Sequence, residues 1–196
     1  MGKVIVDVSP SVDGFIAGPG VRVGRPFGSA GHRLHRWLGL EGATPTAADE
    51  EAAKATFANA GAVVLGRRMF EVGIGTWGAD GAFGLPCFVV TSRAHEDVVR
   101  GPTRFAFVTG GFGQTVQFAH QAAGGADVVV AGGAQVVQEC LAAGLVAELR
   151  LHVVPVLLGG GTRLFGGPLA DEAELEHVGA VSTPLATHLT FRVHSS

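Results

Sequence analysis

Short apolar runs rich in β-forming residues alternate with stretches of helical composition along most of the chain. A strand that is followed by a helix and then by another strand of the same sheet needs a crossover connection, which pairs the strands in parallel. The runs are almost continuous in Val and Ile, which is typical of strands covered on both faces. The pattern predicts an α/β fold with strands near 3–9, 62–65, 87–91, 104–108, 127–131 and 148–158 and helices near 46–60, 111–123 and 133–143.

The C-terminal part has a different pattern. The segments "ELEHVGAVST" and "THLTFRV" alternate apolar and polar residues with a period of two, and Pro184 separates them. This pattern is typical of a pair of antiparallel strands, which would close the sheet. Residues 18–45, in contrast, hold many Gly and Pro with little periodicity, so we expect a long mobile loop of the kind that is often functional.

Composition restricts the class of protein. The chain has 196 residues, 47% hydrophobic and 16% charged, with a formal net charge of -3. Such a chain forms one well-buried domain, 1–196, and has no general attraction for nucleic acid or anionic membranes. No segment has the length of apolar sequence that a membrane helix needs, and Cys87 and Cys140 are typical of buried free thiols. We therefore expect a cytoplasmic protein.

Two glycines at the end of one predicted strand indicate a phosphate site. Gly132 and Gly133 stand between the strand and the following helix, where the backbone can approach a diphosphate and the helix offers free N–H groups. A tight turn without a ligand would need the same glycines. Two other glycine motifs fail on context, because "GIGTWG" follows a helix and "GGGTRLF" lacks the Lys of a phosphate loop.

Two further strand ends carry polar residues. Arg67 and Arg68 follow the strand near 62–65, and Thr91, Ser92 and Arg93 follow the strand near 87–91. Ligands of open α/β sheets bind at the carboxyl ends of the strands, so these groups could share one site with the glycines. The arginines could also be ordinary solvated residues of a first helical turn.

Several of these segments, in this order, resemble the dihydrofolate reductase superfamily. The similarity is greater to the branch that contains the reductase domain of riboflavin biosynthesis proteins, or RibD C-terminal domain. The matching segments are "SVDGFIAGP" (11–19), "LGRRMFE", "VAGGAQVVQECLAAGLVAELRLHVVPVLLGGGTRLF" (130–165) and "THLTFRV". The resemblance implies a three-layer α-β-α fold with a mixed, mostly parallel sheet.

The resemblance also implies that NADPH binds across the strand ends. Its pattern places one group of residues near the nicotinamide, one along the adenine-side ribose and phosphates, one on the far side of the adenosine, and one around the pyrophosphate. The residues near the nicotinamide are Ser9, Ile16 and Ala17, and those along the adenine-side ribose and phosphates are Gly66, Arg67, Arg68 and Met69. The residues on the far side of the adenosine are Thr91, Ser92 and Arg93, and those around the pyrophosphate are Gly132, Gly133, Ala134, Gln135 and Val136.

Candidates for catalysis and substrate binding lie elsewhere. Dihydrofolate reductases use a buried carboxylate after the mobile loop, and its nearest equivalents are Asp49 and Glu50, although acidic residues in a first helical turn are commonly solvated. The loop offers an anion site or a stacking surface, or an amphipathic turn in which Leu34, Trp37 and Leu38 pack inward. The substrate candidates are His32, Arg36, Trp37, Leu158, Gly159 and Gly160.

Other sites are not expected. His32 and His35 have no third ligand at useful spacing, so we expect no metal. His152 and His188 are interpreted as structural residues. The zinc deaminase half of bifunctional riboflavin proteins needs H-x-E and P-C-x-x-C, and neither motif occurs here.

The sequence therefore predicts an NADPH-dependent reductase of a small heterocyclic or ribosylated, pyrimidine- or pterin-like substrate. The alternatives are a genuine dihydrofolate reductase and a non-catalytic NADP(H)-binding protein. The family resemblance and the long apolar run at 148–158 also indicate a homodimer.

Overall fold

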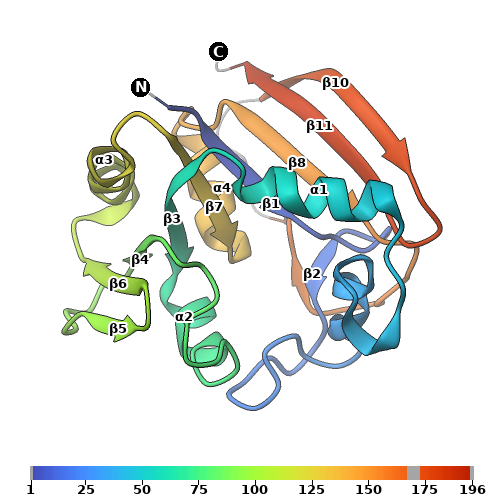
Figure 1. Ribbon diagram of the computed structural model, residues 1–196, viewed down its shortest axis with the longest axis horizontal. Helices are drawn as coiled ribbons and strands as arrows, with labels where there is room; N and C mark the ends of the chain where they lie inside the picture. The colour runs from blue at the N-terminus through green and yellow to red at the C-terminus, as the bar shows by residue number, and fades with distance from the viewer. Residues whose placement is uncertain (1, 167–172, 195–196) are drawn as a thin grey trace.

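A nine-stranded sheet forms the centre of the computed structural model, which describes residues 2–166 and 173–194 (Figure 1). From edge to edge its strands are β10 (Glu174–Ser182), β11 (Thr187–His194), β8 (Glu148–Val153), β1 (Val4–Val8), β7 (Asp127–Gly132), β3 (Ala60–Gly66), β4 (Pro86–Val90), β6 (Thr103–Val108) and β5 (Val98–Arg100). Two short strands, β2 (Phe15–Ala17) and β9 (Thr162–Arg163), pair with each other in a separate sheet.

The pairing of the strands is mostly parallel. Strands β8, β1, β7, β3, β4 and β6 pair in parallel, and β5 is antiparallel to β6. At the other edge, β11 is antiparallel to both β8 and β10. The predicted mixed sheet with antiparallel C-terminal strands is therefore confirmed, and Pro184 lies in the turn between the last two strands.

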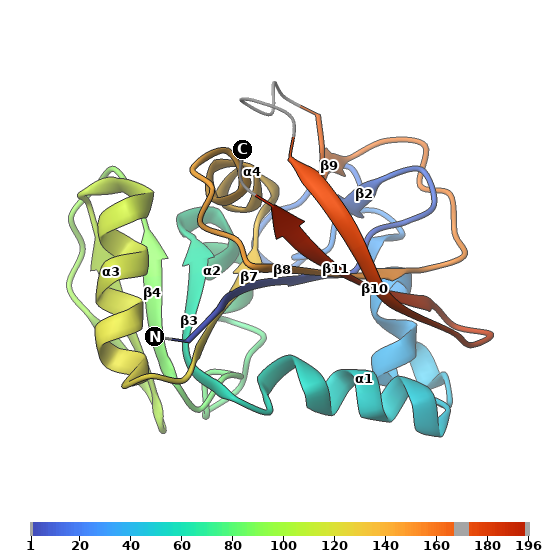
Figure 2. The ribbon, with the colours of Figure 1, turned by 90° about the horizontal axis from the view of Figure 1, so that it is seen from above.

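Helices cover both faces of the sheet. The α-helices are α1 (Ala47–Phe57), α2 (Arg67–Gly73), α3 (Gly111–Ala123) and α4 (Ala134–Ala142). Successive side chains of a strand point to opposite faces. In β3, Ala62 and Val64 belong to the core cluster formed with α3 and α4, whereas Val63 and Leu65 belong to the cluster formed with Phe70 of α2. Figure 2 shows α1 and α4 on opposite sides of the sheet, which gives three layers.

The segment 18–45 is more ordered than the expected loop. It contains two 3-10 helices, η1 (Gly31–Leu38) and η2 (Leu40–Gly42). A 3-10 helix has three residues per turn, so Leu34 and Trp37 lie on one face, and both are buried against Val154 and Ala186. The prediction of a long loop is thus wrong for 31–42, while inward packing is correct for Leu34 and Trp37. Leu38 is 43% exposed.

The apolar run 148–158 is a strand only as far as Val153. Pro155 lacks a backbone N–H group and cannot continue the ladder. Strand β8 lies inside the sheet between β1 and β11, so its apolar residues serve the core of this chain.

The structure bears on two further expectations, the state of the cysteines and the presence of membrane helices. Cys87 and Cys140 are free and buried, as predicted, and burial raises the pKa of each thiol to about 12. In the described part of the chain, every helix is too short or too polar to span a bilayer.

Candidate functional site

A cavity of 1130 Å³ lies at the carboxyl ends of the parallel strands β1, β7, β3 and β4. These strands are neighbours in the sheet and run in the same direction, so the residues that follow them meet at one edge. The 3-10 helix η1 contributes His35, Trp37 and Leu38 to the wall of the cavity, and α1 contributes Ala53, Thr56 and Phe57.

Every residue that the family resemblance implies for cofactor binding lines this cavity. The four groups come from β1 and β2, from the start of α2, from the end of β4, and from the turn between β7 and α4. They are Ser9, Ile16, Ala17, Gly66, Arg67, Arg68, Met69, Thr91, Ser92, Arg93, Gly132, Gly133, Ala134, Gln135 and Val136. The fold thus brings these residues together, and their contact with a cofactor stays a prediction.

The glycine pair leaves room where the chain enters α4. Gly132 has a φ of 121°, which favours glycine, and a Cβ built on Gly133 would meet no atom within 4 Å. Gly133 caps α4 without a side-chain hydrogen bond, so the first N–H groups of this helix have no side-chain partner at the cap. Open space beside free N–H groups is what a phosphate needs.

Arginine side chains form the cationic part of the cavity wall. The Nε of Arg67 donates to Glu71 Oε1 over 2.7 Å, and its guanidinium lies 5.2 Å from the centre of the Phe107 ring. The Nη1 of Arg67 is buried and has no partner among the described residues. Arg68 Nη2 donates to the Val21 carbonyl over 2.9 Å, which ties the start of α2 to the segment after β2. Arg67 is therefore fixed with donor capacity left over for an anion.

Only one of the predicted substrate residues of segment 31–40 lines the cavity. Trp37 lines the cavity, donates from Nε1 to Ser9 Oγ over 3.0 Å, and packs on the His152 ring at 4.2 Å between centroids. His32 and Arg36 do not line it, and His32 pairs with Glu41.

The segment 158–160 also lies outside the cavity wall. The N–H groups of Leu158 and Gly159 donate to the carboxylate of Asp13 over 3.1 and 2.7 Å, and Gly160 does not line the cavity either. A hydrogen bond from Ser11 and these two bonds lower the pKa of Asp13 to about 2. This segment therefore stabilises the loop after β1 through an ionised carboxylate.

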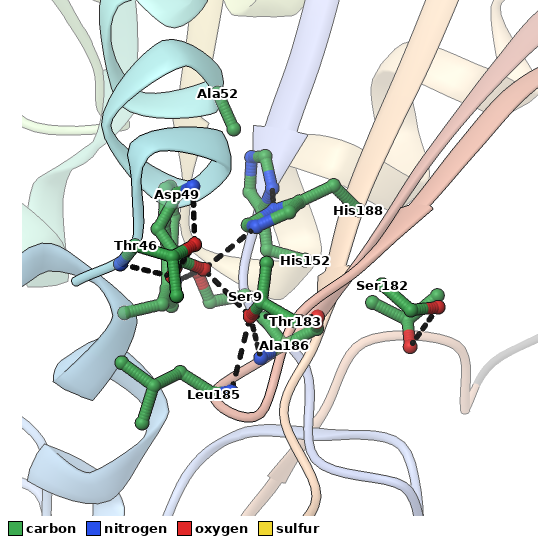
Figure 3. A network of polar contacts seen from close by, with 12 residues as sticks. Ser9, Thr46, Asp49, Ala52, His152, Ser182, Thr183, Leu185, Ala186 and His188 are labelled. Carbon is green, nitrogen blue, oxygen red and sulfur yellow. Dashed lines mark hydrogen bonds and ion pairs between the residues drawn. The ribbon is translucent and has the colours of Figure 1, made fainter.

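The predicted catalytic carboxylates do not reach the cavity. Asp49 is completely buried at the start of α1, where it forms a capping box with Thr46. Its Oδ1 accepts from Thr183 Oγ1 over 2.8 Å and lies 3.0 Å from His188 Nε2 (Figure 3). Burial opposes ionisation, but hydrogen bonds from Thr46, His188 and Thr183 outweigh it and lower the pKa of Asp49. Glu50 is exposed.

Asp7 is an ionisable residue of the cavity wall that was not among the residues predicted from the sequence. Asp7 lies in the middle of β1, its carboxylate is 7% exposed, and its Oδ1 is 3.0 Å from His152 Nε2. An Asp inside an otherwise apolar, buried run such as "KVIVDVS" is a signal that could have identified it, because unpaired buried carboxylates are rare. His35 also lines the cavity, and desolvation lowers its pKa to about 4.

The fold and the position of the cavity define an α/β protein of the dihydrofolate reductase-like class. Residues 2–188 match the RibD C-terminal domain, and the chain belongs to this family. No curated protein sequence matches the chain.

Solved structures share the fold at low sequence identity. A putative riboflavin biosynthesis protein from Shewanella sp. PV-4 has a TM-score of 0.72 at 20% identity, with 98% of this chain and 99% of that chain covered. A dihydrofolate reductase from Enterococcus faecalis, complexed with NADP(H) and RAB-propyl, has a TM-score of 0.62 at 15% identity, with 99% of this chain and 98% of that chain covered. A pyrimidine reductase-like protein from Corynebacterium diphtheriae has a TM-score of 0.60 at 14% identity, with 100% and 93% covered.

Proposed function

We propose that the chain is an NADPH-dependent reductase of a small heterocyclic, pyrimidine-like substrate. The observation that supports this most is the convergence of the open Gly132–Gly133 turn and the Arg67 and Arg68 side chains on one cavity at the strand ends. Membership of the RibD C-terminal domain family supports the same reaction class. So does the shared fold with a dihydrofolate reductase that was solved with NADP(H).

The residues of the cavity fit this cofactor. The open space at Gly133 and the N-terminus of α4 would hold the pyrophosphate, and the unpartnered Nη1 of Arg67 would donate to the 2'-phosphate. Ser9, Ile16 and Ala17 would border the nicotinamide, and Trp37 forms part of the adjoining cavity wall. When bound, the cofactor supplies a hydride, and the protein contributes mainly position and electrostatics.

A pyrimidine-like substrate fits better than dihydrofolate. A dihydrofolate reductase of the usual kind needs a free carboxylate after the loop, and Asp49 is already bound by Thr46, His188 and Thr183. The test is a panel of aminopyrimidines, with and without a ribosyl group, together with dihydrofolate. We expect loss of the reduced-nicotinamide absorbance only with a member of the pyrimidine group. Binding of NADPH without oxidation by any member would favour the non-catalytic alternative.

Gly133→Val is expected to weaken NADPH binding at least about tenfold, which corresponds to about 1.4 kcal/mol, while the fold stays intact. The new side chain would meet no protein atom but would occupy the space proposed for the pyrophosphate. Calorimetry measures the affinity, and circular dichroism the fold. Gly113→Val is the matched control, because Gly113 also has open space around it but lies in α3, outside the cavity wall. Equal NADPH affinity in the Gly133 variant and the parent would show that the glycine pair is only structural.

We also propose that the chain forms a homodimer. The predicted reason, an excess of apolar surface on 148–158, does not apply, because β8 is an inner strand. Strand β10, however, lies at the edge of the sheet and exposes Leu175, Val178 and Val181. An exposed apolar edge strand is a common surface for pairing. Sedimentation should give about twice the chain mass of 20.0 kDa. A species of only the chain mass at micromolar concentration would contradict the proposal.

A further inference from the structure

Four buried ionisable side chains form a hydrogen-bonded chain from α1 to the cavity. Asp49 Oδ1 lies 3.0 Å from His188 Nε2, His188 Nδ1 lies 2.7 Å from His152 Nδ1, and His152 Nε2 lies 3.0 Å from Asp7 Oδ1. Figure 3 shows the Asp49 end of this carboxylate–imidazole chain, where β11 and β8 present the two imidazoles to α1. Asp7 is the one member of the four that lines the cavity.

The number of protons in this chain follows from its geometry. Each of its three links joins two atoms that need a proton between them, so three protons are required. Two neutral imidazoles supply one proton each, and ionised carboxylates supply none. The carboxylate–imidazole chain therefore holds three protons. This is one more than two neutral imidazoles and two ionised carboxylates would supply.

The surroundings place this extra proton at the cavity end. Hydrogen bonds lower the pKa of Asp49 in spite of its burial, and burial lowers the pKa of His188, so Asp49 is ionised and His188 is neutral with its proton on Nε2. His188 Nδ1 must then accept from His152 Nδ1. The remaining proton lies between His152 Nε2 and Asp7 Oδ1.

Among the residues that the structure describes, neither Arg nor Lys forms an ion pair with the Asp7 carboxylate. Arg150 is its register partner on β8, but the Arg150 guanidinium is bound to Glu148 and to the Ala55 carbonyl. His35 of η1 is neutral above a pH of about 4. The second Asp7 oxygen, Oδ2, is buried without a partner among the described residues. A buried oxygen of this kind is costly unless a ligand or a proton satisfies it.

We propose that Asp7 is the catalytic proton donor of the reductase and that its carboxyl group contacts the nitrogen of the substrate that becomes protonated. This inference rests on the function proposed above. In reduction of a C=N bond, the carbon accepts the hydride with its electron pair, and the π electrons move to nitrogen and form the new N–H bond with the Asp7 proton. This is the single proton of the His152–Asp7 link, so its transfer leaves the Asp7 carboxylate ionised and His152 Nε2 without a proton. One proton from solvent restores the chain after product leaves.

Trp37 and His152 position this donor. The Trp37 ring packs on the His152 ring and lines the cavity, which shields the His152–Asp7 link from water.

The first test uses the protein alone and does not depend on turnover. Proton NMR of the parent should show three low-field ring N–H resonances, one for each link. Asp7→Asn should remove only the one between His152 and residue 7, because the Asn amide can donate to His152 Nε2 and keep the other two links. Asp97→Asn is the control, since Asp97 is bound to Arg104 on the surface, and it should keep all three resonances. Three unchanged resonances in Asp7→Asn would overturn the proposal.

The second test measures NADPH affinity and turnover in the same variants. Asp7→Asn should keep the parent's NADPH affinity and lose at least about a hundredfold in kcat, in the range typical of a lost general acid. An unchanged kcat would overturn the role of Asp7 even if the resonance is lost. A parent that binds no NADPH would instead contradict the proposed function, and the NMR result would then decide the position of the proton.

Discussion

Replacing Asp49 by Ala is expected to lower the free energy of unfolding by at least about 3 kcal/mol. The substitution removes the capping box of α1, which is worth about 1 kcal/mol. It also leaves the buried His188 ring and the Thr183 hydroxyl without the carboxylate that they contact, at about 1–3 kcal/mol for each unsatisfied group. Urea unfolding at neutral pH measures the change, with the slope compared to that of the parent.

Glu50→Ala provides the matched control in the same helical turn. Glu50 is exposed, so its substitution should change the free energy of unfolding by no more than about 0.5 kcal/mol. If Asp49→Ala is as stable as Glu50→Ala, then the hydrogen bonds of Asp49 contribute little and the carboxylate–imidazole chain is not a stabilising unit.

The stability of the parent should fall as the pH is lowered, in two ranges. His188 has a lowered pKa in the folded state, so the unfolded chain binds its proton first, and stability decreases as the pH falls below about 6.5. Asp49 also has a lowered pKa, so its contribution is present above about pH 4 and is lost as the pH falls through the folded-state pKa. Thermal unfolding at a series of pH values measures both. A midpoint that is constant between pH 7 and pH 3 would contradict these assignments.

The double variant Arg67→Ala, Arg68→Ala is expected to lose most of the preference for NADPH over NADH. The two cofactors differ in the 2'-phosphate, and the net charge of -3 gives no general attraction for it. Charge-assisted contacts are worth roughly 1.5–3 kcal/mol each, which is about tenfold to a hundredfold or more in affinity. Arg67 lines the cavity, and its Nη1 has no hydrogen-bond partner among the described residues. Calorimetric titration with both cofactors measures the preference.

Two controls make this test specific. Arg104→Ala removes an exposed arginine that pairs with Asp97 away from the cavity, and it should leave both affinities unchanged. Salt should weaken NADPH binding more steeply than NADH binding in the parent, because the additional contact is ionic. Equal affinities of the parent for NADPH and NADH would show that these arginines do not recognise the 2'-phosphate.

The strand ends of the cavity could be predicted because they depend on short-range pattern and on one rule of sheet topology. Each apolar run before Gly66, Thr91 and Gly132 identifies a strand by itself, and alternation with helices makes the strands parallel. Parallel strands end at the same edge, so residues that follow different strands meet there without any knowledge of the packing between layers. Prediction from the periodicity of apolar residues was wrong for 31–42. There the spacing of Leu34 and Trp37 fits a 3-10 helix and not the α-helical or extended periods.

What the sequence determined by itself is therefore the α/β sheet, its antiparallel C-terminal strands and the edge at which the cavity lies. Only the tertiary structure decided which ionisable groups meet below that edge. Asp7, Asp49, His152 and His188 come from β1, α1, β8 and β11, and their links join residues separated by 36 to 145 positions. No local pattern relates such residues. Their contact depends on the side of the sheet that α1 covers and on the register of β8 with β1 and β11, and these are set by packing of the whole core.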